Sequence, residues 1–406
     1  MTTDDVLDGP MAWRRLAIAL AVAVIGNVGM WSIVVLMPAI QTEFGADRAA
    51  ATLPYTVLMI GFGLGNLVIG WLVDRYGLAR ALICSALCVG VGFVVSALSS
   101  GMALLVVAQG LVGFGTAATF GPLIADVSLW FLRRRGIAVS VAACGNYLSG
   151  AVWPVLLTGP MGALDWRESS LVLAVVVVAL IVPLSVLLRG RVPETSLRRA
   201  DAASSSRALL TGLSPRALIW LLGCAGIGCC VAMSMPQVHI VALCVDLGFG
   251  AVVGGQMLSL MLAGGVVSRL VSGLLADRLG GVRTLLLGSV LQCLALFLYL
   301  PAGGLVSLYT VSLVFGLAQG GIVPSYALVV REFLPAREAG QRVGFVMMLT
   351  IMGMALGGWM SGWIYDMTGD YQLAFVNGLV WNMLNIAIVV AIFWSARPGR
   401  PAQVAA

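Results

Sequence analysis

The chain has 406 residues, of which 60% are hydrophobic and only 10% are charged. A soluble protein carries about 25% charged residues, so this composition excludes an ordinary soluble enzyme and indicates an integral membrane protein. All 23 basic residues are arginine and histidine occurs once, which excludes a lysine-dependent phosphate-binding loop and a two-histidine zinc motif. We therefore expect neither a cofactor nor a metal, and no enzymatic activity.

Twelve apolar runs follow one another along the chain, and most are about as long as a membrane-spanning helix requires. We predict an all-α membrane protein with twelve transmembrane helices. The runs cover residues 16–40, 53–73, 81–98, 102–125, 136–159, 170–188, 217–243, 252–276, 284–300, 305–330, 343–364 and 373–394.

The arginines are distributed unequally between the segments that connect these runs. Twenty of them fall on the side that carries both termini, two (Arg48 and Arg167) fall on the other side, and Arg269 lies inside a run. By the positive-inside rule, both termini are expected in the cytoplasm and the chain in the cell inner membrane. The net charge of +6 then reflects membrane topology, and we expect no nucleic-acid partner.

The longest hydrophilic stretch, residues 189–216, contains proline, a serine run and six arginines. This composition is typical of a cytoplasmic linker. It divides the chain into an N-terminal six-helix bundle at 1–188 and a C-terminal six-helix bundle at 217–406.

An internal repeat relates the two halves. The pattern G-x-x-x-D-R-x-G occurs at residues 70–77 and again at 273–280, half a chain later. The runs at 102–125 and 305–330 also resemble each other, since both are rich in glycine and reach a proline. Duplicated halves of this kind predict two bundles related by a pseudo-twofold axis, as in rocking secondary transporters.

The paired loops and the arrangement of six plus six spans resemble the major facilitator superfamily. That resemblance implies that Asp74, Arg75, Asp277 and Arg278 form a conformational latch, which holds the cytoplasmic helix ends together in the outward-open state. The family usually has basic residues directly after the final glycine of the motif, whereas here a single arginine, Arg80 or Arg283, follows three positions after that glycine.

A narrower resemblance begins at Trp130-Phe131-Leu-Arg133-Arg134-Arg135 and continues to Gly145. It is similar to a signature of monocarboxylate transporters and oxalate–formate exchangers. Arg269, with Gly273 four residues later, resembles the anion-binding arginine of that branch. Two family acids are missing, because Asn27 replaces the helix 1 acid and Gly265 stands where some members have aspartate.

Arg269 is the most informative candidate for substrate binding. It lies eight residues before Asp277, which is about 12 Å along a helix, and a charge at that depth costs at least ~2.5–3.5 kcal/mol. Its guanidinium fork could bind a carboxylate with two hydrogen bonds. The alternative is a structural arginine that caps backbone carbonyls or pairs with another helix.

Polar side chains on other spans could line the same cavity. Each of them could instead make an interhelical hydrogen bond, which is common in membrane proteins. The candidates are Asn27, Trp31, Asn146, Tyr147 and Tyr326, with Ser325 beside the last.

Two further titratable residues, Asp126 and His239, lie near the ends of spans. We expect Asp126 to form a structural ion pair with Arg80 or with the arginines at 133–135, rather than to couple protons. His239 has a titration range suited to protons, but an interfacial position without a coupling role is the simpler interpretation.

These features together predict a monomeric secondary transporter for a small organic anion, in particular a monocarboxylate, that works by alternating access in the lipid bilayer. Proton symport is the usual mode of the resembling family, which makes protons a candidate coupling ion. The alternatives are an organic anion exchanger of the dicarboxylate or formate type, a multidrug efflux antiporter and a non-transporting membrane sensor. The segments between the apolar runs are too short for the soluble output domain that a sensor requires.

Overall fold

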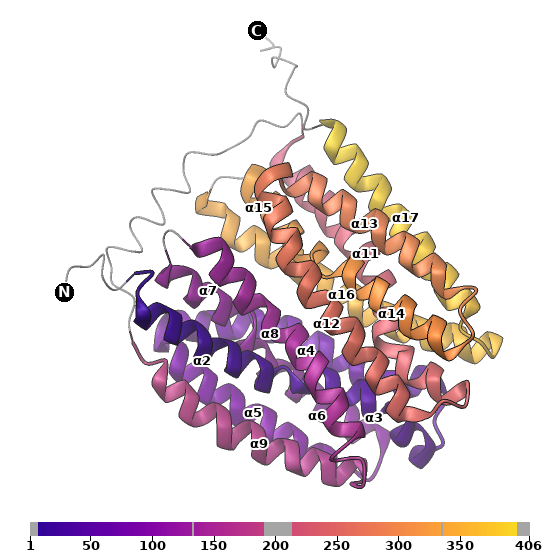
Figure 1. The fold of residues 1–406 in the computed structure, drawn as a ribbon. Helices are drawn as coiled ribbons and strands as arrows, with labels where there is room; N and C mark the ends of the chain where they lie inside the picture. Colours follow the sequence, from indigo (N-terminus) through magenta and orange to yellow (C-terminus); the bar gives the residue numbers. More distant parts are fainter. Residues whose placement is uncertain (1–6, 132–133, 191–212, 334–335, 396–406) are drawn as a thin grey trace.

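The computed structural model describes residues 7–131, 134–190, 213–333 and 336–395, and every regular element in these ranges is a helix (Figure 1). Twelve segments are long and apolar enough to cross a membrane. The predicted all-α membrane fold is therefore confirmed. Most of the predicted linker, residues 191–212, lies outside the described residues, as do the side chains of Asp74 and Asp277.

The helices of the first half of the chain are α2 (Pro10–Gly26), α3 (Val28–Phe44), α4 (Arg48–Tyr76), α5 (Leu78–Ala97), α6 (Met102–Thr116), the short 3-10 helix η1 (Ala117–Thr119), α7 (Gly121–Trp130), α8 (Arg135–Thr158) and α9 (Trp166–Leu187). Those of the second half are α11 (Pro215–Asp246), α12 (Gly250–Leu279), α13 (Gly281–Tyr299), α14 (Leu305–Gln319), α15 (Ile322–Phe333), α16 (Ala336–Thr368) and α17 (Gln372–Ser395).

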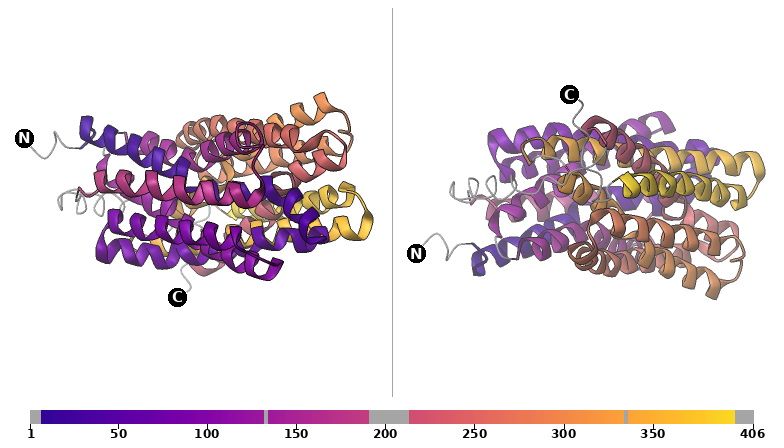
Figure 2. Two further views of the ribbon diagram at one scale, coloured as in Figure 1. Left: turned by 90° about the horizontal axis from the view of Figure 1, so that it is seen from below. Right: turned by 90° about the horizontal axis from the view of Figure 1, so that it is seen from above.

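The helices form two groups, α2–α9 and α11–α17, that lie side by side (Figures 1 and 2). Within the first group α4 packs on α6 and α5 packs on α9, while within the second α11 packs on α16 and α17. Between the groups the main contacts are those of α4 with α16 and of α8 with α12. A site shared by the two groups is therefore expected beside these helix pairs.

The two ends of the bundle differ in which helix termini they carry. At end A, α2 begins at Pro10 and α17 ends at Ser395; at end B, α3 ends at Phe44 and α4 begins at Arg48. Asp47 caps α4 at end B, where its carboxylate accepts a hydrogen bond from the Ala50 N–H at 2.7 Å, a common way to satisfy a helix N-terminus. The two ends thus provide a reference for placing the sites.

Three of the expected spans are interrupted. The run at 16–40 divides between α2 and α3 at Asn27, whose backbone leaves the helical region and whose side-chain amide donates to the Ala23 carbonyl at 2.8 Å. Asparagine competes with helical backbone bonding in this way. The runs at 102–125 and 305–330 break at η1 and between Gln319 and Ile322. At these breaks side chains hydrogen-bond to backbone carbonyls, as the Asn27 amide does to Ala23 and Arg269 does to Gly320.

The final glycines of the two repeated motifs adopt the same conformation. Gly77 has φ 85° and ψ 156°, and Gly280 has φ 82° and ψ 162°. Each lies between two helices at end A, in a left-handed region that residues with a side chain rarely adopt. The repeat seen in the sequence is therefore also a repeat of backbone geometry.

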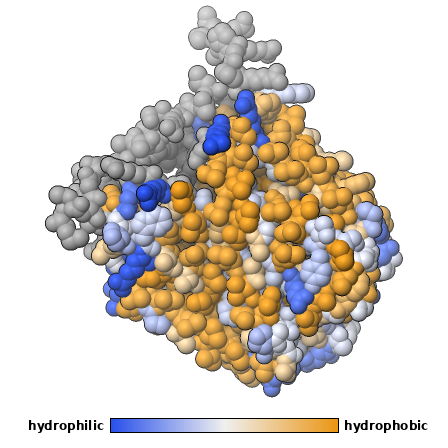
Figure 3. Space-filling model, viewed as in Figure 1, coloured by the Kyte–Doolittle hydropathy of each residue, from blue (hydrophilic) through white to orange (hydrophobic). Residues whose placement is uncertain are grey.

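Apolar side chains cover most of the visible surface, and polar residues gather mainly toward its edges (Figure 3). Large aliphatic and aromatic residues such as Val175, Trp220 and Leu274 are exposed. Such a surface is suited to contact with lipid chains rather than water.

Candidate functional site

Arg269 of α12 lies between the two helix groups. Its Nε donates to the Gly320 carbonyl at 3.1 Å, and its Nη1 donates to the Ala143 carbonyl of α8. Its Cζ stands 4.0 Å from the centre of the Tyr147 ring, which favours a cation over the aromatic face. The side chain therefore ties the second helix group to the first.

Arg269 is only 5% exposed, and among the described residues no carboxylate forms an ion pair with it. A buried charge is usually paired with an opposite charge. Two of its three nitrogens donate to backbone carbonyls, so the fully free two-nitrogen fork expected from the sequence is not present. Arg269 thus caps backbone carbonyls, as the structural alternative expected. Its third nitrogen, Nη2, has no hydrogen-bond partner in the described part of the chain.

The break between α14 and α15 is what makes the Gly320 carbonyl available. A Cβ on Gly320 would lie 2.1 Å from the Gly265 carbonyl oxygen, and one on Gly321 would lie 1.9 Å from the Ser272 Oγ. Only glycine permits these approaches. The paired glycines therefore bring the end of α14 directly against α12 beside Arg269.

Two glutamines that the sequence did not single out lie in the same cluster. The Oε1 of Gln319 accepts hydrogen bonds from the Gln237 Nε2 at 2.7 Å and from the Tyr147 hydroxyl at 3.4 Å. Both glutamines are buried. Gln319 immediately precedes the glycine pair and lies in an apolar span, and that combination was the signal available in the sequence. We name Arg269, Tyr147, Gln237 and Gln319 the central cluster.

Tyr147 packs on α12 because Gly265 has no side chain. A Cβ on Gly265 would lie 2.8 Å from two Tyr147 ring carbons. The tyrosine ring therefore occupies the space that an acidic side chain at position 265 would need.

Of the six predicted binding residues, Arg269 and Tyr147 come into direct contact. Trp31 instead donates to Asn146, at 3.0 Å to the backbone oxygen and 3.1 Å to the side-chain oxygen. The Asn27 amide donates to the Thr119 Oγ1 at 3.2 Å. These three residues thus join helices of the first group, and in the described part of the chain no hydrogen bond links them to Arg269.

Tyr326 belongs to a separate polar network in the second group. Its hydroxyl donates to the Asn385 side-chain oxygen at 2.7 Å, and the Asn385 amide donates to the Ser289 Oγ at 2.9 Å. The network is fully buried. It joins α13, α15 and α17, so this hydroxyl is engaged in interhelical packing.

At end B, Arg48 joins the two helix groups. Its Nη2 donates to both carboxylate oxygens of Asp246 at 2.8 Å. The Asp366 carboxylate accepts from the backbone N–H groups of Arg48 at 2.8 Å and Ala49 at 2.7 Å, where a negative charge suits the start of α4. The Arg48 guanidinium also lies 4.8 Å from the centre of the Tyr365 ring. We name Arg48, Asp246, Asp366 and Tyr365 the Arg48 cluster.

His239 lies fully buried near this cluster, toward end B. Its Nε2 is 2.8 Å from the Gly358 carbonyl oxygen, and its Nδ1 is 3.1 Å from the Tyr371 hydroxyl. The imidazole connects α11 to α16 and to the start of α17. It is therefore part of the packing between helices at end B.

Asp126 forms the expected ion pair, but with a different partner. Arg15 binds both carboxylate oxygens, with Nε 2.7 Å from Oδ2 and Nη2 2.9 Å from Oδ1. The Arg15 guanidinium also lies 4.6 Å from the centre of the Trp130 ring. Arg80 was therefore the wrong partner, because α2 packs beside this carboxylate, while Arg133 and the side chain of Arg135 lie outside the described residues.

At the repeated motifs the structure describes only part of the predicted latch. The Arg75 guanidinium lies 5.6 Å from the centres of both the Trp71 and the Tyr76 rings. Arg75 and Arg278 are exposed. Arg75 therefore contacts aromatic neighbours on its own helix in this conformation.

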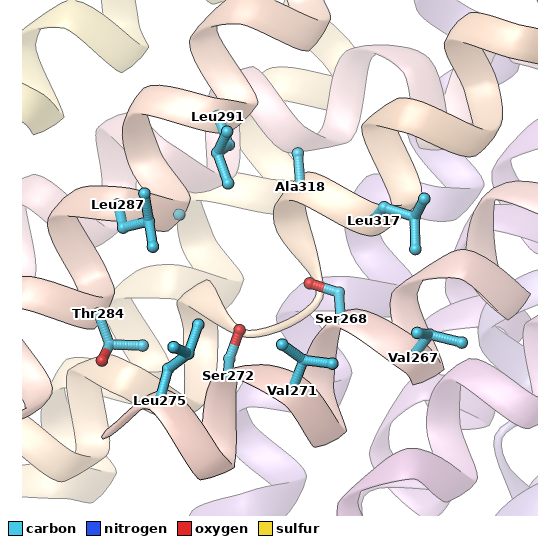
Figure 4. A pocket seen from close by; sticks show the side chains of 11 residues that line it. Val267, Ser268, Val271, Ser272, Leu275, Thr284, Leu287, Leu291, Leu317 and Ala318 are labelled. Atoms are coloured by element: carbon cyan, nitrogen blue, oxygen red, sulfur yellow. The ribbon is translucent and has the colours of Figure 1, made fainter. Parts of the chain in front are cut away.

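A hollow of about 160 Å³ lies on another side of α12 (Figure 4). Its lining is aliphatic apart from the hydroxyls of Ser268, Ser272 and Thr284. No charged side chain lines it. The hollow is thus unsuited to an anion, and the central cluster is the better candidate for a substrate site.

The twelve spans, the repeated halves and a buried polar cluster between them define a membrane transport protein built from two helical bundles. The family model of the Major Facilitator Superfamily matches residues 19–341 and 246–406. The chain belongs to the major facilitator superfamily, and it resembles the monocarboxylate transporter branch.

The chain is 29% identical to human monocarboxylate transporter 11 over 393 residues, which cover 91% of this chain and 80% of that protein. It is 24% identical to an agnestins efflux protein of Paecilomyces divaricatus, over 86% of this chain and 80% of the relative. Among solved structures, a bacterial homologue of the human lysosomal transporter Spinster, in an inward-facing and occupied conformation, matches with a TM-score of 0.69 and 12% identity. That match covers 96% of both chains and supports the shared fold.

Proposed function

We propose that this protein is a secondary active transporter that moves a small organic anion, a monocarboxylate in particular, across the cell inner membrane. The observation that carries the proposal is Arg269, a buried cation between the two helix groups with no described carboxylate paired to it. An anionic substrate supplies the missing charge. The name of the human relative, monocarboxylate transporter 11, supports the same substrate class.

The proposed mechanism is alternating access between the bundles at 1–188 and 217–406, joined by the segment 189–216. End A, which carries most of the arginines, is the cytoplasmic face, so both termini are cytoplasmic. The Arg48 cluster closes the outer face in this conformation. Asp74, Arg75, Asp277 and Arg278 form the latch that closes the inner face in the opposite state.

Proton symport is the proposed coupling mode, and anion exchange is the second candidate. Exchange is favoured by the surroundings of Arg269, where the described part of the chain places neither a carboxylate nor the single histidine in contact with the guanidinium. Because arginine stays charged, the central cluster then has no carboxylate or imidazole that could take up the proton, apart from the carboxylate of the substrate itself.

The decisive experiment is uptake of radiolabelled acetate, lactate and succinate into proteoliposomes, with and without a pH gradient and with and without internal anion. Arg269→Gln should reduce uptake at least 30-fold, since a charge-assisted contact contributes on the order of 2–5 kcal/mol. Near wild-type affinity in the folded Gln variant contradicts the anion-site assignment. Uptake that needs internal anion and ignores the pH gradient identifies exchange.

A further inference from the structure

We propose that the side-chain amide of Gln319 is a second anion-binding donor, which works together with the Nη2 nitrogen of Arg269. The inference rests on the proposed function and deepens it. It assigns the substrate carboxylate to a pair of donors from two residues instead of to one guanidinium fork.

The first observation is an unsatisfied donor. Gln319 is 0% exposed, and its Nε2 has no hydrogen-bond partner among the described residues. A buried amide without a partner costs on the order of 1–3 kcal/mol, and most buried polar atoms in proteins are paired. An unpaired donor inside a transport protein is explained when a ligand supplies the acceptor.

The second observation is that the amide is held in place by its oxygen. The Gln319 Oε1 accepts from Gln237 at 2.7 Å and from Tyr147 at 3.4 Å. With these two donors on the oxygen, the nitrogen is the atom left to face a ligand. Gln237 and Tyr147 are thus positioning residues, and Tyr147 comes from the opposite helix group.

The third observation is the proximity of Arg269. The Gly320 carbonyl, one residue after Gln319, accepts from Arg269 Nε at 3.1 Å. The same Tyr147 that contacts the Gln319 oxygen has its ring centre 4.0 Å from the guanidinium carbon. Both free donors, Nη2 and Nε2, therefore belong to one cluster around one tyrosine.

These two donors complement a carboxylate. Arg269 has committed Nε and Nη1 to backbone carbonyls, so one carboxylate oxygen binds Nη2 and the other binds the Gln319 amide. One cationic donor and one neutral donor match a single negative charge. The arrangement thus favours a monoanion over a dianion.

The test measures uptake kinetics of reconstituted full-length protein with radiolabelled acetate and lactate. Gln319→Leu should raise KM about tenfold or more, because a hydrogen bond to a charged group contributes about 1.5–3 kcal/mol. Gln319→Glu should lose uptake almost completely, since the new carboxylate competes for Arg269. Gln319→Met, of similar length to glutamine, replaces the Leu variant if that variant does not fold.

The matched control is Gln109→Leu. Gln109 is also a buried glutamine of a membrane-spanning helix, but its amide donates to the Ser96 Oγ at 3.1 Å within the first helix group. An unchanged KM in Gln319→Leu or Gln319→Met, with uptake still lost in Arg269→Gln, overturns this inference and leaves the proposed function intact. Absence of carboxylate uptake by the wild-type protein overturns both.

Discussion

Arg48 and Asp246 lie 198 positions apart in the chain and form an ion pair in which one guanidinium nitrogen is 2.8 Å from each carboxylate oxygen. The pair joins the start of α4 to the end of α11, and Arg48 is only 5% exposed. Together with Asp366 at the N-terminus of α4, it holds the two helix groups together at end B. We therefore assign to this pair a direct role in closing that end.

Arg48→Gln should open end B more often. Breaking a part-buried ion pair costs on the order of 1–3 kcal/mol, which is enough to shift a two-state equilibrium several-fold. Cys244, a buried residue near the end of α11, serves as a native reporter. Its alkylation rate, followed by mass spectrometry, should increase several-fold.

The control for this experiment is Arg167→Gln, which removes an ion pair with Glu43 at the same end but within the first helix group. It should leave Cys244 alkylation unchanged. Equal alkylation rates in Arg48→Gln and wild type are inconsistent with a closing role for the pair.

Gly265→Ala should reduce anion uptake by displacing Tyr147. The new methyl group would stand 2.8 Å from two ring carbons, closer than van der Waals contact allows, so the ring must leave its place beside Arg269. Uptake kinetics should show at least a several-fold rise in KM. Gly273→Ala is the control, because its Cβ would meet a single Ser140 hydroxyl at 3.2 Å on the same helix pair. Similar kinetics in the two variants would argue against a role of Tyr147 at the site.

Glu332→Gln should make the thermal stability of the protein depend less on pH. Burial raises the pKa of the Glu332 carboxyl above its usual range, and the Gly281 N–H, which donates to it at 2.7 Å, partly opposes this rise. The folded state therefore binds the proton more tightly than the unfolded chain. The contribution of the Glu332 carboxyl to stability therefore grows as the pH falls through the raised pKa, and it is lost as the pH rises above that pKa.

In thermal unfolding of detergent-solubilised protein, Glu332→Gln should have a Tm equal to or above that of the wild type at about pH 8. It should gain less than the wild type on acidification to about pH 5. Asp370→Asn, at an exposed carboxylate of end B, controls for general effects of pH on the detergent complex. A steeper pH dependence in the Gln variant than in the wild type is the opposite of this expectation.

Asp126→Asn should weaken the fold more than it changes proton coupling, because both carboxylate oxygens are bound by Arg15. Arg15→Gln should cause a similar loss of Tm, and the double variant should lose less than the sum of the two. Proton movement is read with a pH dye in liposomes during substrate uptake. Tight proton cotransport that disappears in a stable Asp126→Asn variant would assign the coupling role to this carboxylate instead.

Asp74→Asn and Asp277→Asn should alter the balance between the two access states and leave the order of preference among anions unchanged. Both residues belong to the repeated motifs at end A, whereas the central cluster lies deeper, where transporter sites are usually found. Cysteine accessibility at both ends and competition between several anions provide the two readouts. A changed anion preference with unchanged accessibility contradicts the latch assignment.

The sequence by itself determined the class of the protein. Hydrophobic runs of spanning length require helices in a bilayer, because unpaired backbone groups are too costly there, and the twelve spans are confirmed. The motifs at 70–77 and 273–280 predicted a duplicated fold, and the matching conformations of Gly77 and Gly280 follow from it. Arg269 was identifiable as a binding candidate because a buried charge is expensive and therefore seldom accidental.

Only the tertiary structure decided which polar groups meet. Asp126 binds Arg15, which lies 111 positions earlier in the chain, and Gln319 joins Arg269 through a tyrosine of the opposite group. The helix breaks at Asn27 and after Gln319 also fall inside apolar runs that read as continuous. The physical reason is that hydropathy reports the average environment of a span, whereas hydrogen bonds and ion pairs depend on a few ångströms of approach between helices that are distant in the chain.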